Sequence, residues 1–420
     1  MNILILGSGG REHSFAWAVM QNPKCHTLIA APGNAGISQI ATCVDIDIED
    51  GNAVADLANE KSIDFVIIGP EAPLAAGVAD TLRARGIPVF GPSKQAAQLE
   101  TSKSFTKEIC MAAGVPTAPA KHFLDPSHAK AFLAEGTYPI VIKADGLAAG
   151  KGVVVASDTA TALTAIDKIF DDPSNRHTGV LIEDYIEGQE VSYFILCDGE
   201  TILPIGTAQD HKRIGDGDTG PNTGGMGAYS PAPVLTPNLE KEVLNRIISP
   251  TIAEMYRRGT PYQGVLYAGL MIRNAKPFLI EYNARFGDPE AQVLMMRLGA
   301  QAFDLFHAVV EKRLCETRVN WADDHALTVV LATKGYPGEF QKGSEIKRLE
   351  DVKESSLQMC FHAGTREQNG KYFTNGGRVL NATARGSSLQ EARDSAYKII
   401  ESIDWPDGIY RQDIGWRALK

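Results

Sequence analysis

The sequence predicts a multidomain protein of the α/β (α+β) class that begins with a Rossmann-like parallel sheet. One theme recurs in the first hundred residues: a short apolar run, a glycine-rich turn, and then a helical pattern. The apolar runs are at residues 3–6, 28–30, 65–68 and 89–90. Such alternation indicates a parallel sheet whose ligands bind where its strands end. Near the other end of the chain, a strand-like run at 327–332 and an amphipathic helical pattern at 392–400 predict a small C-terminal α/β domain.

Composition limits the kinds of protein that this can be. With 420 residues, 44% of them hydrophobic, the chain is long enough for about two to four domains. Its formal net charge of −10 argues against nucleic acid as a partner. The six cysteines form no CxxC pair, so neither a zinc site nor a disulfide framework is indicated. No signal-like start and no apolar run of membrane-spanning length occurs, so we expect a cytoplasmic protein with no membrane partner.

The first glycine-rich turn reads GSGGREH at residues 7–13. It lacks the third glycine of the dinucleotide fingerprint GxGxxG and places Arg11 at the start of the helix. We therefore expect a phosphate or phosphosugar at this helix N-terminus, where Arg11 adds a cation to the helix dipole and the free backbone amides. The alternative is a nicotinamide-dependent dehydrogenase built on this domain.

A second glycine-rich stretch, VIKADGLAAGKGVVVAS at residues 141–157, separates two β-rich runs. It differs from a Walker P-loop, because three residues rather than four separate its glycines and no Ser or Thr follows Lys151. The stretch predicts two strands joined by a glycine loop whose backbone amides can approach phosphate. A lysine in the position of Lys143, at the end of an apolar strand, is ordinarily an edge residue that extends to solvent.

Two later segments are rich in oxygen ligands. At residues 183–190 a strand leads into an acidic turn, where Glu190 could accept both hydroxyls of a ribose; a solvated surface turn is the alternative. At residues 278–290, alternation along a strand places Glu281, Asn283 and Arg285 on one face. Carboxylate and amide oxygens suit Mg²⁺ bound to a triphosphate, and an arginine can fork onto a phosphoryl group. The sequence therefore predicts a metal and triphosphate site on the strand that contains Glu281 and Asn283.

Residues 209–227, QDHKRIGDGDTGPNTGGMG, combine many glycines with charged and amide side chains. We expect them to be too glycine-rich for regular structure and to form an ordered loop that moulds over a small polar substrate. A disordered linker is the alternative, although Met226, Tyr229 and the proline-rich run that follows favour order.

The order of these segments resembles that of the ATP-grasp enzymes, and five motifs narrow the resemblance to the glycinamide ribonucleotide synthetase family. The motifs are GSGGREH at 7–13, GPE at 69–71, KADGLAAGKGV at 143–153, QDHKRIGDGDTGPNTGGMGAYSPAP at 209–233 and EYNARFGDPEAQ at 281–292. The likeness covers essentially the whole chain, and the last two motifs are the most specific. It implies an ATP-grasp fold with four parts: a Rossmann-like domain at 1–104, a central ATP-grasp domain at 105–122 and 191–326, a lid subdomain at 123–190 and a C-terminal domain at 327–420.

Enzymes of this family join glycine to 5-phosphoribosylamine with ATP, through glycyl phosphate, in de novo purine synthesis. The resemblance implies ATP and Mg²⁺ (or Mn²⁺) as cofactors, and it assigns roles to particular residues. ATP would be bound by Lys103, Lys143, Gly146, Gly150, Lys151, Gly152, Glu183, Tyr185, Ile186 and Glu190. The metal would be bound by Glu281 and Asn283. The catalytic residues would be Arg285, Lys212 and Asp210. The other substrates would be bound by Gly9, Gly10, Arg11, Asn34, Glu71 and Asp288.

The resemblance leaves several points open. Most ATP-grasp proteins carry a further acidic metal ligand, but residues 265–271 offer no carboxylate, which leaves the ligands of a second metal in doubt. The expected partners are small molecules, with possible transient contact to the amidophosphoribosyltransferase that acts before it, and the expected state is a monomer or a weak dimer. The alternatives are a related ATP-grasp carboxylase or transformylase, and a non-catalytic ATP-binding protein.

Overall fold

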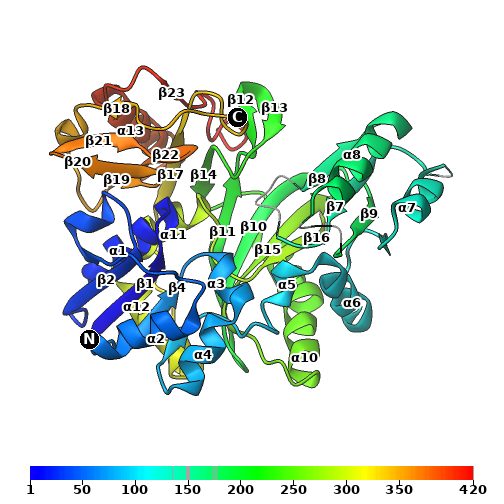
Figure 1. Cartoon of the computed structure of the whole chain (residues 1–420), viewed down its shortest axis with the longest axis horizontal. Helices are drawn as coiled ribbons and strands as arrows, with labels where there is room; N and C mark the ends of the chain where they lie inside the picture. Colours follow the sequence, from blue (N-terminus) through cyan, green and yellow to red (C-terminus); the bar gives the residue numbers. More distant parts are fainter. Residues whose placement is uncertain (135, 148–151, 174, 176, 420) are drawn as a thin grey trace.

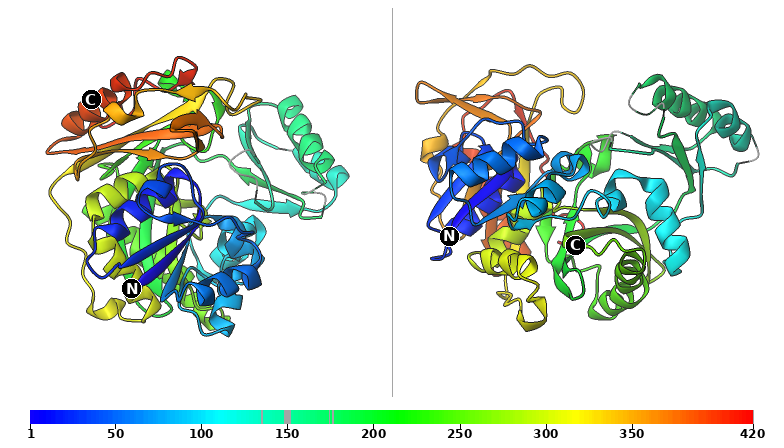
Figure 2. Two further views of the ribbon diagram at one scale, coloured as in Figure 1. Left: turned by 60° about the vertical axis from the view of Figure 1, so that its left-hand side comes forward. Right: turned by 60° about the horizontal axis from the view of Figure 1, so that its bottom comes forward.

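The structure is a computed structural model that describes residues 1–134, 136–147, 152–173, 175 and 177–419. It consists of an N-terminal region, a projecting region at residues 120–184, a large central sheet and a C-terminal region (Figure 1). The projecting region stands out from the rest of the molecule in two further views (Figure 2).

The N-terminal region is a five-stranded parallel sheet, as the alternation of apolar runs and turns predicts. The strand order is β3-β2-β1-β4-β5. The strands are β1 (Asn2–Gly7), β2 (Thr27–Pro32), β3 (Thr42–Cys43), β4 (Phe65–Ile68) and β5 (Val89–Phe90). The helices are α1 (Gly10–Met20), η1 (Ile37–Gln39), α2 (Gly51–Glu60), α3 (Glu71–Ala76), α4 (Val78–Ala84) and α5 (Gln98–Thr101).

Alternation along β1 decides which hydrophobic core each face of this sheet joins. Leu4 and Leu6 belong to the core that includes α2 and α4, whereas Ile3 and Ile5 belong to a second core. The second core contains α1 and two helices from much later in the chain, α11 (Glu290–Leu298) and α12 (Gln301–Val310). This packing holds the segment that follows Glu281 against the first glycine-rich turn.

The projecting region has its own four-stranded sheet and its own small core. The strand order is β6-β9-β7-β8, and β7 pairs with β8 as an antiparallel hairpin, with Lys143 opposite Val153. This hairpin confirms the two predicted strands. The elements are α6 (Lys103–Ala113), which leads into the region, β6 (Ala120–Phe123), α7 (Pro126–Leu133), β7 (Ile140–Ala144), β8 (Val153–Ala156), α8 (Thr159–Asp171) and β9 (Val180–Asp184). Ile142, Leu133 and Ile166 lie in the core that joins the sheet to its two helices.

One nine-stranded sheet joins the central and C-terminal regions. Its order is β16-β15-β10-β11-β14-β17-β22-β19, with β23 beside β17. The central strands are β10 (Gln189–Asp198), β11 (Ile202–Asp210), β14 (Gly227–Ser230), β15 (Gln263–Arg273) and β16 (Lys276–Asn283). The C-terminal strands are β17 (His325–Thr333), β19 (Gln358–His362), β22 (Arg378–Gly386) and β23 (Gly408–Ile409). Because β14 pairs with β17, the predicted C-terminal domain shares its sheet with the central one.

Helices and short strands complete both regions. The central region adds α9 (Pro237–Val243), the π-helix η3 (Leu244–Ile248), α10 (Ser249–Arg257) and η4 (Leu314–Glu316). The C-terminal region adds β18 (Glu345–Ile346), η5 (Leu349–Asp351), β20 (Thr365–Gln368), β21 (Lys371–Thr374) and α13 (Leu389–Ser402). The amphipathic helix predicted at 392–400 is α13, which buries Ala392, Ala396 and Ile399.

The polar stretch at 209–227 contains regular structure, so the expectation of an irregular loop was wrong, as was the alternative of a disordered linker. It holds the end of β11, the hairpin of β12 (Arg213–Gly215), η2 (Asp216–Asp218) and β13 (Thr219–Asn222), and the start of β14. Gly217 and Gly225 adopt positive φ angles of 65° and 112°. These glycines allow the chain to turn at the ends of the short strands and do not prevent the strands from forming.

Among the residues that the structure describes, no single helix has the length and apolarity needed to cross a membrane. In the same described residues, α11 and α12 taken together are long and apolar enough, judged by length and composition alone. They are bent by 104° at the break between them.

Candidate active site

A cavity of about 680 Å³ lies where the projecting region, the central sheet, the N-terminal region and the β12–β13 hairpin meet. Most of the residues predicted for a site line it, although they come from motifs far apart in the sequence. Those residues are Arg11, Glu71, Lys103, Lys143, Gly146, Gly152, Glu183, Tyr185, Ile186, Glu190, Asp210, Lys212, Glu281, Asn283, Arg285 and Asp288. The predicted Gly9, Gly10 and Asn34 are not part of the lining, and Gly150 and Lys151 fall outside the described residues.

Lys143 is buried, so the interpretation of it as a solvent-seeking edge lysine was wrong. Its side chain is only 4% exposed, and its Nζ lies 2.9 Å from Oε2 of Glu183. Lys107 approaches the other carboxylate oxygen of Glu183 at 3.2 Å. Glu183 is itself buried at the end of β9, which also excludes a solvated turn at this residue. The carboxylate therefore holds two lysines at the wall of the cavity.

Lys103 starts helix α6 and completes the cationic side of the cavity. Its Nζ donates to the carbonyl oxygen of Gly146 at 2.8 Å. Its backbone N–H donates to Oδ1 of Asp145 at 2.6 Å, which ties the start of the helix to the β7–β8 hairpin. Burial lowers the pKa of Lys103, and the neighbouring Lys143 adds to this against the opposing effect of Glu281. A polyanion would relieve this crowding of positive charge.

Glu281 and Asn283 lie at the end of β16, on opposite sides of the buried Tyr282 in sequence. Burial alone would raise the pKa of Glu281, but Lys212, Lys143 and Lys103 outweigh it and lower that pKa. The carboxylate is therefore charged at neutral pH and is the hard oxygen ligand that Mg²⁺ prefers. In the described part of the chain, no group of three or more His, Cys, Asp and Glu side chains is placed to hold a metal. The pair fits a metal that takes its other ligands from phosphate and water.

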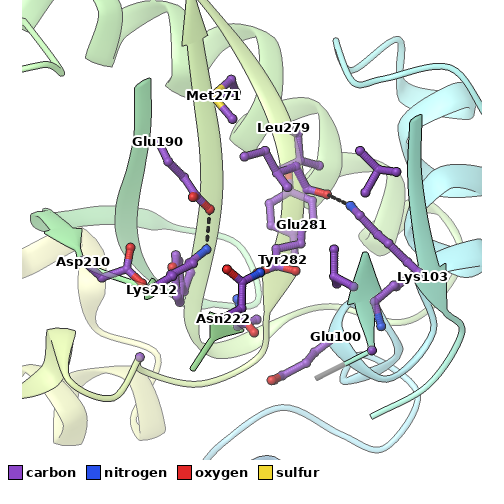
Figure 3. A pocket seen from close by; sticks show the side chains of 18 of the residues that line it. Glu100, Lys103, Glu190, Asp210, Lys212, Asn222, Met271, Leu279, Glu281 and Tyr282 are labelled. Atoms are coloured by element: carbon purple, nitrogen blue, oxygen red, sulfur yellow. Dashed lines mark hydrogen bonds and ion pairs between the residues drawn. The ribbon is translucent and has the colours of Figure 1, made fainter. Parts of the chain in front are cut away.

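Asp210, Lys212 and Glu190 form a charged group on the other side of β16 from Lys103 (Figure 3). Lys212 pairs with Glu190 through Nζ and Oε1. Burial, together with the charges of Glu290 and Glu190, raises the pKa of Asp210 to about 8 against the opposing effect of Lys212. Burial would lower the pKa of Lys212, but Glu190 and Asp210 raise it well above its ordinary value. Lys212 is therefore a permanent cation, whereas Asp210 changes protonation near neutral pH.

Arg285 joins the N-terminal region to the central one through two carboxylates. Its Nε lies 3.1 Å from Glu71 and its Nη2 lies 2.9 Å from Glu100, while Nη1 donates to the carbonyl of Phe286 at 3.2 Å. Burial would raise the pKa of Glu71, but Arg285 and Arg11 outweigh it and lower that pKa to about 2. Glu100 is the reverse case, because burial raises its pKa despite Arg285. Three of the five N–H groups of Arg285 thus have partners.

The first glycine-rich turn is occupied by the protein's own side chains. Glu12 accepts the N–H of Gly9 at 2.7 Å and pairs with Arg11 at 2.5 Å, and Arg11 also donates to the carbonyl of Phe286 at 3.0 Å. The Gly9 amide that was expected to be free for an anion is therefore already bonded. At Gly10, a Cβ would lie 2.3 Å from Nδ2 of Asn381, so this glycine allows close packing of α1 on β22.

Asn34 has a complete set of hydrogen bonds within the protein. Its Nδ2 donates to the carbonyls of Ser8 and His362, both at 2.8 Å, and its Oδ1 accepts from Gly36 and Ile37, both at 2.9 Å. An amide side chain has two donors and two acceptor positions, so none remains for a ligand in this arrangement. Asn34 here fixes the turn after β2.

Sequence reasoning missed two further groups at the cavity. Arg378 of β22 contacts the carbonyls of Gly224 and Asp288, and its Nη2 lies 3.3 Å from the Asp288 carboxylate. Glu290 is 3% exposed and accepts from Ser192 at 3.2 Å. Glu290 was within a recognised motif, but no local pattern connects Arg378 with that motif, because the contact spans 90 residues.

Three family models, all of phosphoribosylglycinamide synthetase, match the chain. The N domain matches residues 1–100, the ATP-grasp (A) domain 101–291 and the C domain 326–417. The chain is 53% identical over 420 residues to a phosphoribosylamine–glycine ligase from Mesorhizobium japonicum, covering 100% of this chain and 99% of that protein. It is 49% identical over 419 residues to the chloroplastic phosphoribosylamine–glycine ligase of Arabidopsis thaliana, covering 98% and 79%.

Solved structures confirm the predicted ATP-grasp fold. Phosphoribosylamine–glycine ligase from Thermotoga maritima is similar with a TM-score of 0.84 and 32% identity, covering 98% of this chain and 100% of that one. The biotin carboxylase domain of a 2-oxoglutarate carboxylase from Hydrogenobacter thermophilus, solved in complex with MgADP and bicarbonate, gives a TM-score of 0.72 at 16% identity and covers 97% and 91%. This second likeness is one of fold alone.

Proposed function

The chain belongs to the phosphoribosylglycinamide synthetase family, and from this membership we infer that it joins glycine to 5-phosphoribosylamine with ATP. The products are glycinamide ribonucleotide, ADP and phosphate, and the reaction passes through glycyl phosphate in de novo purine synthesis. The observation that carries this function is that lysines, Arg285, Glu281 and Asn283 from distant motifs converge on one cavity.

Charge neutralisation dominates the first step. A carboxylate oxygen of glycine attacks the γ-phosphorus of ATP, the bond from that phosphorus to the β–γ bridging oxygen breaks, and ADP leaves with the electron pair. A carboxylate and a triphosphate repel each other, so cations around the transferring group lower the barrier. We assign Lys103 and Lys143 to the α- and β-phosphates. We assign Arg285 to the transferring group, toward which it can direct the two N–H groups that have no partner among the described residues.

The second step forms the amide. The amine of phosphoribosylamine attacks the carbonyl carbon of glycyl phosphate, the C–N bond forms, and phosphate leaves as the C–O bond breaks. The attacking nitrogen must lose a proton in this step. Asp210 is the proposed acceptor, because a pKa of about 8 is close to the working pH, where a general base is most effective.

Glu281 and Asn283 are the proposed ligands of Mg²⁺ or Mn²⁺. When bound, such an ion neutralises charge on the phosphate oxygens. The lowered pKa of Glu281 keeps its carboxylate available for this role across the physiological range. Because residues 265–271 bring no carboxylate, we propose no protein ligand for a second ion.

Each substrate has a proposed place in the cavity. We assign Tyr185 and Ile186 to adenine and Glu190 to the ribose of ATP. We assign to the phosphates Gly146, Gly150, Lys151 and Gly152. Glu183 acts through the lysines that it holds. The phosphoribosylamine lies toward Arg11 and Glu71, with Gly9, Gly10 and Asn34 shaping that turn, and glycine lies toward Lys212 and Asp288.

The proposed setting is the cytoplasm, with small-molecule partners and neither nucleic acid nor membrane. We also propose transient contact with the amidophosphoribosyltransferase that supplies the amine, and a monomer or weak dimer. We propose the domain limits 1–104, 105–122 with 191–326, 123–190 and 327–420. The first and last of these domains lie near family-model limits at 1–100 and 326–417.

The test is ADP release by the purified protein with Mg²⁺, glycine and freshly generated phosphoribosylamine, omitting one substrate at a time. We expect release to require all of them and Glu281→Gln to lower kcat by about 100-fold or more, since a lost charge ligand costs roughly 3 kcal/mol. Glu242→Gln is the matched control, because Glu242 is half-exposed on α9 and meets only Arg246 at 3.8 Å among the contacts described. ADP release that is indifferent to glycine would refute the proposed acceptor.

A further inference from the structure

The β12–β13 hairpin needs support from outside itself. Among the described strands it forms a separate two-stranded sheet. A hairpin of this size is marginally stable in water unless other parts of the chain pack on it. Its residues nevertheless form one wall of the cavity, where Arg213, Asp218 and Asn222 are in the lining.

The segment at residues 411–413, which we call the C-terminal clamp, provides this support. Arg411 is buried, its Nη1 lies 2.9 Å from Oδ1 of Asp218, and the same nitrogen donates to the carbonyl of Arg213 at 3.1 Å. Asp413 accepts from the N–H of Gly217 at 2.8 Å. Asp413 also binds the guanidinium of Arg411 through two contacts of 2.7 Å. The clamp therefore holds β12 and the turn η2 of the hairpin.

A second, separate contact reinforces the clamp. The N–H of Gln412 donates to Oδ1 of Asp216, in the turn of the hairpin, at 2.9 Å. Asp216 is exposed and does not line the cavity, so this contact can be removed without disturbing a buried site.

The clamp is itself anchored on helix α13. Arg393 donates to the carbonyl of Gln412 at 2.7 Å, and the hydroxyl of Tyr397 donates to the carbonyl of Arg411 at 2.7 Å. The same hydroxyl accepts from the N–H of Ile414 at 3.2 Å. A helix of 14 residues with a buried apolar face thus sets the position of the clamp.

Hydrogen bonds connect the hairpin to Lys212, which lines the cavity. The N–H and the hydroxyl of Thr223 both donate to the carbonyl of Lys212, at 2.7 and 2.8 Å. The neighbouring His211 accepts from the N–H of Gly415 at 3.3 Å. Burial, with the charges of Arg411 and Arg417, lowers the pKa of His211 to about 3, so its ring stays neutral and can accept this bond. Lys212 is therefore held from both sides by parts of the chain that depend on residues 411–415.

We propose that Arg411 and Asp413 are positioning residues, which hold the β12–β13 hairpin and Lys212 in the geometry that binds the non-nucleotide substrates. This proposal rests on the proposed function, because glycine is assigned to Lys212, and phosphoribosylamine, assigned to Arg11 and Glu71, attacks the glycyl group bound there. Most of the nucleotide half is built from other elements, namely α6, β7 and β9, although Glu190 of β10, assigned to the ribose of ATP, pairs with Lys212. A loosened clamp should therefore affect the two halves differently.

The test uses Asp413→Asn and Asp216→Ala in the full-length protein, with Asp407→Ala as the matched control. Asp407 is an exposed aspartate close to the clamp in sequence, and it accepts from Ser344 at 2.8 Å within the C-terminal region. The measurements are KM for glycine, KM for phosphoribosylamine and kcat, together with the Kd of ATP from calorimetry.

In Asp413→Asn and in Asp216→Ala we expect KM to rise about fivefold for at least one of the two non-nucleotide substrates. One net hydrogen bond corresponds to about that factor in an equilibrium constant. The cost falls on KM because bound substrate has to order the loosened hairpin, and kcat at saturation should change less than about twofold. The Kd of ATP should change less than that KM, because Lys212 meets the nucleotide half through Glu190. Asp407→Ala should behave like the unaltered protein.

Unchanged KM values in Asp216→Ala, which removes an exposed contact and so keeps the protein folded, would overturn the proposal. An equal weakening of ATP binding would also overturn it, because that result indicates general destabilisation. Failure of the proposed function is a separate outcome: the unaltered protein would then release no ADP in response to glycine.

Discussion

Lys143 and Glu183 show how a single buried pair ties the nucleotide half of the cavity together. Both side chains are nearly inaccessible, at 4% and 5% exposure, and the carboxylate also meets Lys107. Burying a charge is unfavourable unless it is paired, so each member depends on the other. Lys143 also donates to the carbonyl of Ile280 at 3.2 Å, one residue before the proposed metal ligand Glu281. The pair therefore connects the projecting region to the strand that carries Glu281.

Replacement of Lys143 by methionine should weaken ATP binding by about 10- to 100-fold, the effect of losing one hydrogen bond to a charged group. It should also lower the Tm, because Glu183 loses its closer cation. Calorimetric titration with ATP and thermal unfolding measure the two effects. Lys168→Met, an exposed lysine on α8 of the same region, is the control and should change neither. Equal ATP affinity in both variants would show that Lys143 does not contact the nucleotide.

The short hairpins depend on a few glycine positions rather than on glycine content. At Gly225, which links β13 to β14, φ is 112° and a Cβ would lie 2.5 Å from Cδ of Pro289. At Gly217, in the turn between β12 and β13, φ is 65° and a Cβ would meet nothing within 4 Å. The two glycines serve the same segment, but only Gly225 is constrained by both the backbone angle and a close neighbour.

Gly225→Ala should therefore destabilise the protein by about 3 kcal/mol, from backbone strain and overpacking together, and should lower glycine-dependent activity. Gly217→Ala should cost only about 1 to 2 kcal/mol, since that is the penalty for a left-handed alanine where space is free. Urea unfolding of both variants gives the comparison. If the two costs are equal, the contact with Pro289 is relieved by a small shift of the chain.

The N-terminal, central and C-terminal regions are joined by shared cores and by a buried histidine pair. The backbone N–H of His362, in β19, donates to Nδ1 of His13, in α1, at 2.8 Å. The His362 ring lies 3.0 Å from the hydroxyl of Thr365. Burial lowers the pKa of His362 to about 4, and burial with the charge of His362 lowers the pKa of His13. Both rings are therefore neutral in the folded protein at neutral pH.

This pair predicts a loss of stability in mild acid. In the unfolded chain a histidine takes up a proton near its ordinary pKa of about 6.5, whereas folded His362 does so only near pH 4. The unfolded state thus binds more protons between these values, so the contribution of His362 to stability is complete above about pH 6.5 and is lost as the pH falls toward 4. Each bound proton corresponds to about 1.4 kcal/mol per pH unit.

Urea unfolding at several pH values between 7 and 4.5 measures this dependence. His362→Asn should reduce the slope of unfolding free energy against pH by up to one proton, because asparagine does not titrate. His26→Asn is the control, since His26 is exposed just before β2, and its slope should stay closer to that of the unaltered protein. Identical slopes in the His362 variant and the unaltered protein would contradict the prediction.

The sequence by itself determined most of the elements, and its motifs contain most of the residues that the structure brings to the cavity. The alternation of short apolar runs, glycine-rich turns and helical patterns predicted the parallel sheet, and the strand–glycine–strand pattern predicted the β7–β8 hairpin, because both patterns depend on near neighbours in the sequence. The apolar run that leads into Glu281 and Asn283 predicted that both residues lie on a strand, and they lie at the end of β16. These features are local, so a linear pattern contains them.

Only the tertiary structure decided the environment of each residue. It buried Lys143 against Glu183, saturated Asn34 with carbonyls that include that of His362, and brought Arg378 to Asp288. It also gave the glycine-rich segment at 213–222 its regular form, through contacts with Arg411 and Asp413 almost 200 residues away. The groups that bury a residue and satisfy its hydrogen bonds are distant in sequence. A pattern within one segment does not predict which distant groups will contact that segment in the fold.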